Sequence, residues 1–234
     1  MTPENPHKPV KLPQILLLDK TKGKTSYDAI RALKRRFPGE KFGHAGTLDP
    51  NATGLLIVGV GAGTKSLSSL LKLPKTYDAE ILFGLRTDTG DITGKTIESC
   101  NTEHITRSMV EGAVEKLVGT HPYPIPAYSA AKQEGVPLYK KARRGEAVIP
   151  PIREMEVKNA TLKEFALLDS VAINCDTILS GKYPVAKITF DVGSGTYIRS
   201  LAEALGKKLG VPATLSELRR TRIGEFRVEG AETI

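Results

Sequence analysis

The sequence is poor in cysteine, tryptophan and long apolar segments. It has two cysteines among 234 residues and no tryptophan. Cys100 and Cys175 can form at most one disulfide, and their spacing does not suit a metal ion, so we expect a cytoplasmic protein without a metal. The apolar run at residues 15–18 is too short for a signal-peptide core or a membrane span. We therefore expect neither a secreted nor a membrane protein.

What the sequence has in excess is positive charge. The chain carries 34 lysine and arginine residues against 26 aspartate and glutamate residues, a formal net charge of +8. Many of these cations are clustered, at residues 34–36, 140–144 and 219–222. Clustered cations favour a polyanionic partner such as a nucleic acid, although a solvated basic surface without a partner has the same composition.

The first third of the chain alternates strand and helix signals. Residues 1–13 contain four prolines and few apolar side chains, which predicts a flexible tail. Short apolar runs predict buried strands at residues 14–19 and 55–60, and an alternating pattern predicts an amphipathic strand at residues 75–84. Thr25 and Asp28 fit a capping box, which opens a helix that ends near Phe37.

The middle of the chain begins with a polar segment. Residues 86–94 are typical of a loop or hairpin. Residues 102–118 predict a helix, closed by the glycine that follows. The helix is expected to turn four apolar side chains inward: Ile105, Met109, Ala113 and Leu117.

The second half of the chain is predicted to mix loops, strands and helices. Residues 122–144 predict a proline-rich loop followed by a short basic helix from about Leu138. Residues 153–191 predict two or three strands with a turn near residues 180–184. Residues 197–209 predict a helix with one apolar face.

A glycine-rich segment follows the strand at residues 55–60, which raises the question of a bound nucleotide. Its glycines are Gly59, Gly61 and Gly63. A dinucleotide fingerprint needs a glycine where Thr64 stands, and a P-loop needs a lysine directly after the last glycine. We therefore expect no nucleotide cofactor.

The most informative stretch is GHAGTLDPNATG, residues 43–54. Its glycines, proline and small polar side chains predict a tight turn that places Asp49 just before a buried strand. An acid in this position is oriented and partly desolvated without being lost in the core. Two ordinary roles also fit, in which Asp49 caps its own turn and His44 is a hydrogen-bonded loop histidine.

Arg199 occupies an unfavourable position in the predicted helix at residues 197–209. Spacing alone places it as an exposed residue of the first turn, where the partial positive charge of the helix N-terminus disfavours a cation. A nearby carboxylate would compensate for this, and the carboxylate of Asp49 is the candidate.

The stretch GHAGTLDPNATG resembles the catalytic motif of the TruB family of tRNA pseudouridine synthases. RTDTGDITG, SAAKQEG, GTYIR and LRRTRIG are similar to further motifs of this family and follow in the same order. The resemblance implies that Asp49 is the catalytic residue, that Arg199 pairs with it and that Tyr77 stacks on the target base. The residues that it places around the substrate are Lys20, His44, Tyr197 and Leu218. The segment DKTKGKTS departs from the family pattern, because Thr21 replaces a proline.

The resemblance also implies a fold. It is an α+β pseudouridine synthase fold, with a central mixed, mostly antiparallel sheet, flanking helices and an RNA-binding insertion. Residues 14–234 would form the catalytic domain, with the insertion at about residues 122–152. The insertion, whose cations include Lys132 and Arg143, would grip the T-arm of tRNA.

The implied reaction is the isomerisation of one T-loop uridine of tRNA to pseudouridine. It involves no redox step, hydrolysis or energy input, so we expect no cofactor and no metal. We expect a cytoplasmic monomer whose partner is the T-arm of tRNA. Two alternatives stay open: a catalytically idle module that binds or folds tRNA, and a pseudouridine synthase that acts on another RNA.

Overall fold

The computed structural model describes residues 12–174 and 177–233, so residues 1–11 of the predicted tail lie outside the described part. The helices are α1 (Ser26–Arg36), η1 (Gly61–Ser66), α2 (Leu67–Leu71), α3 (Arg107–Glu115), α4 (Leu138–Arg143), α5 (Ile198–Leu209) and η2 (Val228–Gly230), where η marks a 3₁₀ helix. The strands are β1 (Ile15–Lys20), β2 (Phe42–His44), β3 (Thr53–Val60), β4 (Lys75–Phe83), β5 (Leu85–Thr87), β6 (Thr96–Ser99), β7 (Gly119–Pro124), β8 (Lys132–Gln133), β9 (Val136–Pro137), β10 (Ile152–Ile173), β11 (Thr177–Val192), β12 (Ala213–Ile223), β13 (Phe226–Arg227) and β14 (Glu232–Thr233).

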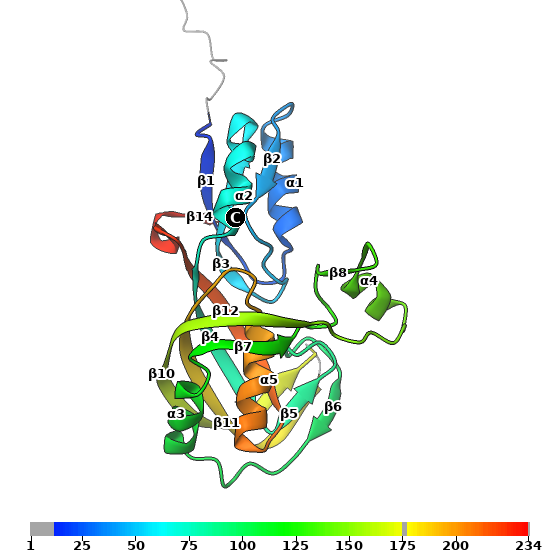
Figure 1. Cartoon of the computed structure of the whole chain (residues 1–234), viewed down its shortest axis with the longest axis vertical. Coiled ribbons are helices and arrows are strands. Elements are labelled where there is room, and N and C mark those ends of the chain that lie inside the picture. Colours follow the sequence, from blue (N-terminus) through cyan, green and yellow to red (C-terminus); the bar gives the residue numbers. More distant parts are fainter. Residues whose placement is uncertain (1–11, 175–176, 234) are drawn as a thin grey trace, which may run out of the picture.

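One large sheet runs through the molecule. Its ten strands in the described residues follow the order β14-β1-β3-β12-β4-β11-β10-β7, with β2 beside β3 and β13 beside β12. Two pairings are parallel, β1 with β14 and β3 with β12, and the others are antiparallel. Figure 1 shows α1 and α2 at one end of the sheet and α3 and α5 at the other. The expected α+β fold with a mixed, mostly antiparallel sheet is confirmed.

The predicted helix near the N-terminus is confirmed, together with its cap. The Thr25 hydroxyl accepts a hydrogen bond from the Asp28 amide, and the Asp28 carboxylate accepts one from the Thr25 amide, so both donors at the start of α1 are satisfied. On its inner face α1 buries Ala29, Ile30 and Leu33 against β3. These contacts fix α1 beside the segment that carries Asp49.

The two strands predicted on either side of the glycine-rich segment are also confirmed. In β3 every residue from Gly54 to Val60 is buried, as expected for a strand covered on both faces. In β4 the buried side chains alternate from Lys75 to Ala79, so this strand is amphipathic at its start. The strand β12 lies between β3 and β4 and pairs with both, which brings the three segments together.

The helix predicted at residues 102–118 is shorter in the structure. It is α3, which begins after Thr106, because the Thr106 hydroxyl accepts a hydrogen bond from the Met109 amide and caps the helix. Ile105 and Leu117 are buried beyond its ends, and Ala113 is buried within it. The inward direction predicted for Met109 is wrong, since this side chain is 40% exposed and Val110 faces the core instead.

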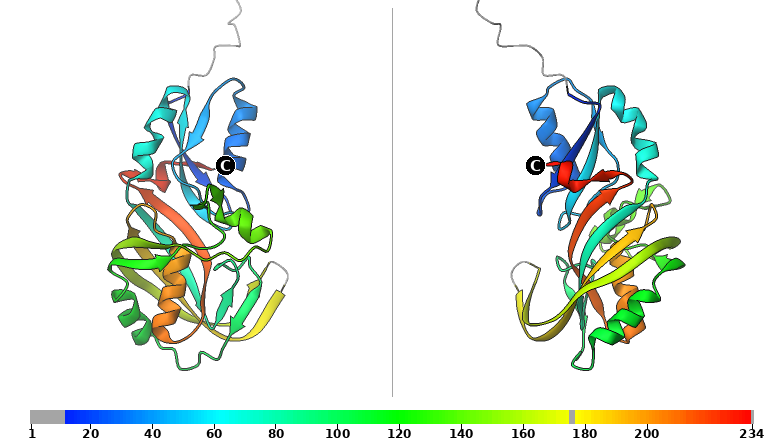
Figure 2. Two further views of the ribbon diagram at one scale, coloured as in Figure 1. Left: turned by 45° about the vertical axis from the view of Figure 1, so that its right-hand side comes forward. Right: turned by 90° about the vertical axis from the view of Figure 1, so that its left-hand side faces the viewer.

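The turn predicted near residues 180–184 is also wrong. Strand β10 ends at Ile173 and β11 begins at Thr177, so the chain reverses earlier, and residues 180–184 lie within β11. Pairs such as Ser170 with Ser180 and Leu167 with Pro184 extend the ladder through this region. The ladder gives the backbone more hydrogen bonds than a turn at residues 180–184 would, and it outweighs the local preference of glycine and proline. Figure 2 shows the long curved hairpin that results.

The segment predicted as a proline-rich loop is partly a strand. Strand β7 covers residues 119–124 and pairs with β10 at the edge of the sheet. The predicted basic helix is confirmed as α4, which starts at Leu138. In Figure 1, β8 and α4 project from the side of the large sheet.

Candidate active site

The loop that carries Asp49 joins β2 to β3 and is held on several sides. The Ala52 amide donates to the Asp49 carbonyl (3.0 Å), which closes a tight turn. The Leu48 amide donates to the Ser26 hydroxyl of α1 (2.9 Å), and the Asn51 side chain donates to the Ser216 carbonyl of β12 (3.1 Å). The backbone of the turn is therefore fixed to both the N-terminal and the C-terminal part of the chain.

The Asp49 carboxylate lies against Arg199. The distance from Asp49 Oδ2 to Arg199 Nη2 is 2.9 Å, and the side chains are 37% and 5% exposed, respectively. Arg199 is the second residue of α5, but it is buried, so the exposed position that spacing predicted for it is wrong. The compensation predicted for this cation is present, in the form of the Asp49 carboxylate.

Arg199 also binds two other loops. It donates to the Thr89 carbonyl (2.9 Å), in the turn between β5 and β6, and to the Tyr128 carbonyl (3.0 Å), at the start of the insertion. Three acceptors from distant segments thus offset the cost of burying this guanidinium near a helix N-terminus. The sequence offered no signal for the two carbonyls, because backbone acceptors carry no residue preference.

Arg220 is a further buried arginine near this loop. It is 1% exposed, and it donates to the carbonyls of Leu55 (2.8 Å) and Gly46 (3.1 Å). At Gly54, where φ is +101°, an added Cβ would lie 2.3 Å from the Arg220 carbonyl oxygen, so this position requires glycine. Arg220 supports the fold of the loop and is not part of a basic surface.

The predicted cation cluster at residues 219–222 is therefore not a free RNA-facing surface. Arg219 pairs with Asp19 (2.7 Å), and Arg222 pairs with Asp191 (3.0 Å). The alternation of a strand could have revealed the burial of Arg220, because Leu218 and Arg220 point to the same face of β12.

Lys20 lies under the loop and is fully buried. Its ammonium group donates to the carbonyls of Lys24 (2.6 Å), Thr21 (3.0 Å) and Pro50 (3.4 Å). Burial lowers the pKa of Lys20 to about 8, while the charge of Asp49 opposes this change. Lys20 joins the turn after β1 to the residue that follows Asp49.

His44, at the end of β2, is half-buried. Within the described residues its Nδ1 atom is buried and has no hydrogen-bond partner, so the ordinary role of a hydrogen-bonded loop histidine does not hold for this nitrogen. Burial, and then the charge of Arg220, lower the pKa of His44. The ring is therefore neutral at neutral pH.

Three further predicted site residues lie on elements next to the loop. Tyr77 of β4 and Leu218 of β12 are each 8% exposed and belong to the same buried cluster as Leu48. Tyr197 is the N-cap residue of α5, directly before Ile198, and Arg153 stacks over its ring at 5.9 Å. These side chains come from separate parts of the sequence, and Tyr197 packs against the cluster that contains the other two and Leu48.

Lys132 and Arg143 lie on the projecting insertion. Both are exposed, and Arg143 stacks over the Tyr139 ring at 5.6 Å. In the described part of the chain neither side chain forms a hydrogen bond or ion pair with Asp49 or Arg199. The structure thus pairs Asp49 with Arg199 and joins Lys20 to the same loop, and it shows no such contact for the two predicted cations of the insertion among the described residues.

The described residues also bear on other classes of site. Among residues 12–174 and 177–233, no group of three or more His, Cys, Asp or Glu side chains could hold a metal ion, and no helix is long and apolar enough to cross a membrane. A cavity of about 800 Å³ is lined by Tyr123, Glu203 and Val211, among others, and Asp49 is not in its lining.

Comparison with known proteins identifies the family. The sequence model described as "TruB family pseudouridylate synthase (N terminal domain)" matches residues 34–198. The chain belongs to the TruB family. This membership agrees with the resemblance stated for residues 43–54, and the family's fold agrees with the sheet observed here.

Two relatives with similar sequences are bacterial. The chain is 41% identical over 213 residues to tRNA pseudouridine synthase B of Xanthomonas campestris pv. campestris (strain 8004). This alignment covers 91% of this chain and 64% of the relative. It is 39% identical over 216 residues to the protein of the same name in Bacillus thuringiensis (strain Al Hakam). This alignment covers 92% of this chain and 67% of that relative. The chain therefore spans about two thirds of the length of these relatives.

Two solved structures with a similar fold come from H/ACA ribonucleoproteins. A chain of an H/ACA ribonucleoprotein bound to a substrate RNA containing 2'-deoxyuridine aligns with a TM-score of 0.62 and 25% identity, over 94% of this chain and 50% of that one. A chain of the archaeal box H/ACA Nop10-Cbf5 complex gives a TM-score of 0.61 and 26% identity over the same shares.

Proposed function

We propose that this chain is a tRNA pseudouridine synthase that isomerises one uridine of the T-loop. The observation that carries the proposal is the pair of Asp49 and Arg199, in which a partly exposed carboxylate is held 2.9 Å from a buried guanidinium. The family and the names of the bacterial relatives support the same reaction.

The reaction needs a carboxylate beside the glycosidic bond. It breaks the bond from N1 to C1', turns the uracil and forms a bond from C5 to C1'; the C5 proton is lost to solvent and N1 gains a proton. Asp49 supplies the carboxylate, as a covalent catalyst on the base or the sugar or as the base that removes a sugar proton. Its partial exposure leaves it open to the nucleotide.

Arg199 holds the Asp49 carboxylate in place and orients it. Its guanidinium is fixed by the Thr89 and Tyr128 carbonyls, so it does not need to reorganise when the substrate binds. Preorganised charge of this kind contributes strongly to catalysis, because it costs no reorganisation at the moment of reaction.

The other predicted residues surround the target nucleotide in this proposal. The uridine leaves its stack at a cost of about a few kcal/mol. Tyr77 stacks on the uracil and takes part in removing the C5 proton. The side chains that shape the site around it are Lys20, acting through the buried turn beside Asp49, and His44, Tyr197 and Leu218.

The insertion is the element that holds the RNA. Lys132 and Arg143 contact the backbone of the T-arm, and the stacked pair of Tyr139 and Arg143 suits an RNA surface. Residues 14–234 act as the catalytic domain, as a cytoplasmic monomer that needs no cofactor.

The proposal is tested with unmodified T-arm hairpin RNA tritiated at uridine C5. Wild-type protein should release tritium and form pseudouridine, whereas Asp49→Ala should bind the hairpin and release none. Asp169→Asn, which removes an exposed carboxylate of β10, is the matched control and should retain the wild-type rate. If the wild type releases no tritium even after a guide RNA is added, the chain is a binding module and not an enzyme.

A second candidate is a pseudouridine synthase guided by another RNA. The likeness to chains of H/ACA ribonucleoproteins favours it, although the identity of 25–26% is lower than the 39–41% found for the bacterial relatives. Activity on a bare T-arm hairpin without a guide RNA excludes this candidate. Activity that appears only after a guide RNA is added establishes it.

A further inference from the structure

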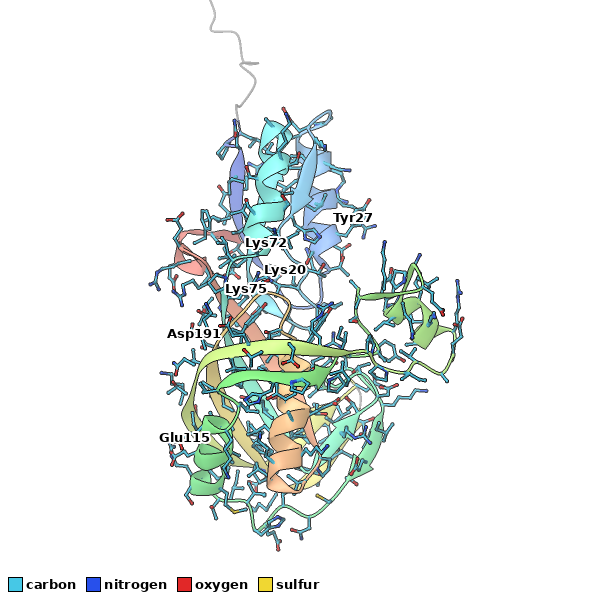
Figure 3. All side chains as sticks on the ribbon, in the orientation of Figure 1. Lys20, Tyr27, Lys72, Lys75, Glu115 and Asp191 are labelled. Atoms are coloured by element: carbon cyan, nitrogen blue, oxygen red, sulfur yellow. The ribbon has the colours of Figure 1, made fainter. Side chains whose placement is uncertain are left out.

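The outer face of α1 carries an exposed aromatic residue among cations. Tyr27 is 60% exposed, and Arg31 lies over its ring with its guanidinium carbon 5.6 Å from the ring centroid. Figure 3 labels Tyr27 on the outer side of α1. On α4 the same residue types recur at the same spacing, with Arg143 over Tyr139 at 5.6 Å. An exposed ring beside a guanidinium suits the sugars and bases of single-stranded RNA.

A cavity of about 300 Å³ opens along the same helix. It is lined by the cations of Lys24, Arg31 and Arg35 and by the small side chains of Ala29 and Ala32. The small side chains leave space between the cations. A space of this size with cations around it suits a phosphate group of a nucleic-acid backbone.

The negative charge in this cavity is already compensated. Asp28 lines the cavity and forms an ion pair with Arg31. Hydrogen bonds from Thr25 and Arg31 hold the pKa of Asp28 well below its ordinary value, so the carboxylate stays ionised within the helix cap. In the described part of the chain no ion pair involves the side chains of Lys24 or Arg35, which leaves their charges available to an anion.

Helix stability alone does not account for this arrangement. Lys34, Arg35 and Arg36 lie in the last turn of α1, where cations interact favourably with the helix dipole. Lys24 lies before the helix, and Arg31 lies in its middle, yet both line the cavity with Arg35. The dipole does not explain their convergence.

The cavity is joined to the loop of Asp49. Lys20, a buried residue of the cavity lining, donates to the Pro50 carbonyl (3.4 Å), and the Gly23 amide donates to the same oxygen (2.9 Å). The turn that carries Lys24 is thus hydrogen-bonded to the residue after Asp49. A phosphate in this cavity would belong to a nucleotide close to the target uridine.

We propose that the cavity formed by Lys24, Arg31 and Arg35 binds a backbone phosphate of the substrate RNA near the target nucleotide, with Tyr27 beside it. This proposal rests on the proposed function, since it assigns a second RNA contact to the same site. In Figure 1, α1 and α4 lie on the same side of the molecule, so the RNA is held from two elements and not by the insertion alone.

The test is the equilibrium binding of the T-arm hairpin to the whole chain at several salt concentrations. The variant is Lys24→Glu with Arg35→Glu, and the matched control is Lys116→Glu with Lys163→Glu, which makes the same change in charge at exposed positions at the end of α3 and in β10. We expect Kd to rise about 10-fold or more for the α1 variant and about threefold for the control. The slope of log Kd against log salt should fall by about 0.7–0.9 for each phosphate that the α1 variant no longer binds.

A milder variant guards against misfolding. Lys24→Gln with Arg35→Gln should retain the wild-type melting temperature and show a smaller loss of affinity in the same direction. Equal Kd values for the α1 variant and the control would overturn the proposal. If wild-type protein binds the hairpin but releases no tritium, the proposed activity fails, whereas the phosphate site is still decided by the ratio of the two Kd values.

Discussion

Two pairs of arginine and aspartate have almost the same length but different surroundings. Arg199 lies 2.9 Å from Asp49, and Arg222 lies 3.0 Å from Asp191. The Arg199 side chain is 5% exposed, whereas the Arg222 side chain is 40% exposed. The distance alone therefore does not distinguish the two pairs.

The difference lies in which partner is open to solvent. Asp191 also accepts a hydrogen bond from Thr76 and its pKa is lowered: burial opposes this change, but the hydrogen bonds of Thr76 and Arg222 outweigh it. In that pair both side chains form contacts between strands of the sheet. In the other pair a buried guanidinium supports a more exposed carboxylate, Asp49, which is the arrangement expected of a reacting group.

The largest expected effect is on the rate of the reaction, and it distinguishes Arg199 from Arg222. Arg199→Ala removes the counter-ion of Asp49 and the donor to two carbonyls, so the rate of tritium release should fall by about 10²–10³-fold. The free energy of unfolding should fall by about 2–4 kcal/mol, less than for a fully buried pair because Asp49 is partly exposed. Single-turnover assays and urea unfolding measure the two quantities.

Arg222→Ala is the matched comparison. It breaks a partly exposed pair, so it should cost about 0–1 kcal/mol of stability and leave the rate within a few-fold of the wild type. Equal losses of rate for Arg199→Ala and Arg222→Ala would contradict the distinction between the pairs.

Arg220 sharpens the comparison, because it is buried but has no carboxylate partner in the described part of the chain. Arg220→Met keeps much of the side-chain volume and leaves the Leu55 and Gly46 carbonyls without their donor. We expect a loss of about 2–4 kcal/mol in the free energy of unfolding. Urea unfolding measures it, and an unchanged midpoint would show that the loop does not depend on Arg220.

These residues also show how far the sequence alone could lead. The capping box of Thr25 and Asp28 and the buried strand β3 were predictable, because their signals are local. The contact of Arg199 with Asp49 was anticipated, since a cation at a helix N-terminus needs compensation. The role of each residue in the reaction stays a prediction.

What the sequence did not reveal depends on distant contacts. The cation cluster at residues 219–222 predicts a basic surface, yet the acceptors of Arg220 at Leu55 and Gly46 lie more than 160 residues away in the chain. The sequence predicts a turn near residues 180–184, but the pairing of β10 with β11 continues through them. Such outcomes follow from the sheet as a whole and not from the residues of one segment.

A buried lysine extends the comparison to pH dependence. Lys75 donates to the carbonyls of Leu71 and Leu73, and burial, together with the charge of Arg220, lowers its pKa to about 8 from 10.5. Between pH 8 and 10.5 the folded chain has released a proton that the unfolded chain still holds, so the stability contributed by this position rises with pH. Relative to that of Lys75→Met, the free energy of unfolding of the wild type should rise by about 1–3 kcal/mol over this range.

Urea unfolding at several pH values measures this gain. Lys187→Met, which removes an exposed lysine whose pKa is raised by Glu164, is the control and should show no such gain. A constant difference between wild type and Lys75→Met from pH 8 to 10.5 would mean that the buried ammonium keeps its ordinary pKa.

In the proposed mechanism the charge of the Asp49 carboxylate, fixed by Arg199, performs the chemistry. The decisive experiment is the single-turnover release of tritium by Asp49→Asn at saturating protein, since this variant keeps the shape of the side chain and removes its charge. We predict hairpin binding close to that of the wild type and no release above background. Release at a rate near that of the wild type would refute the mechanism.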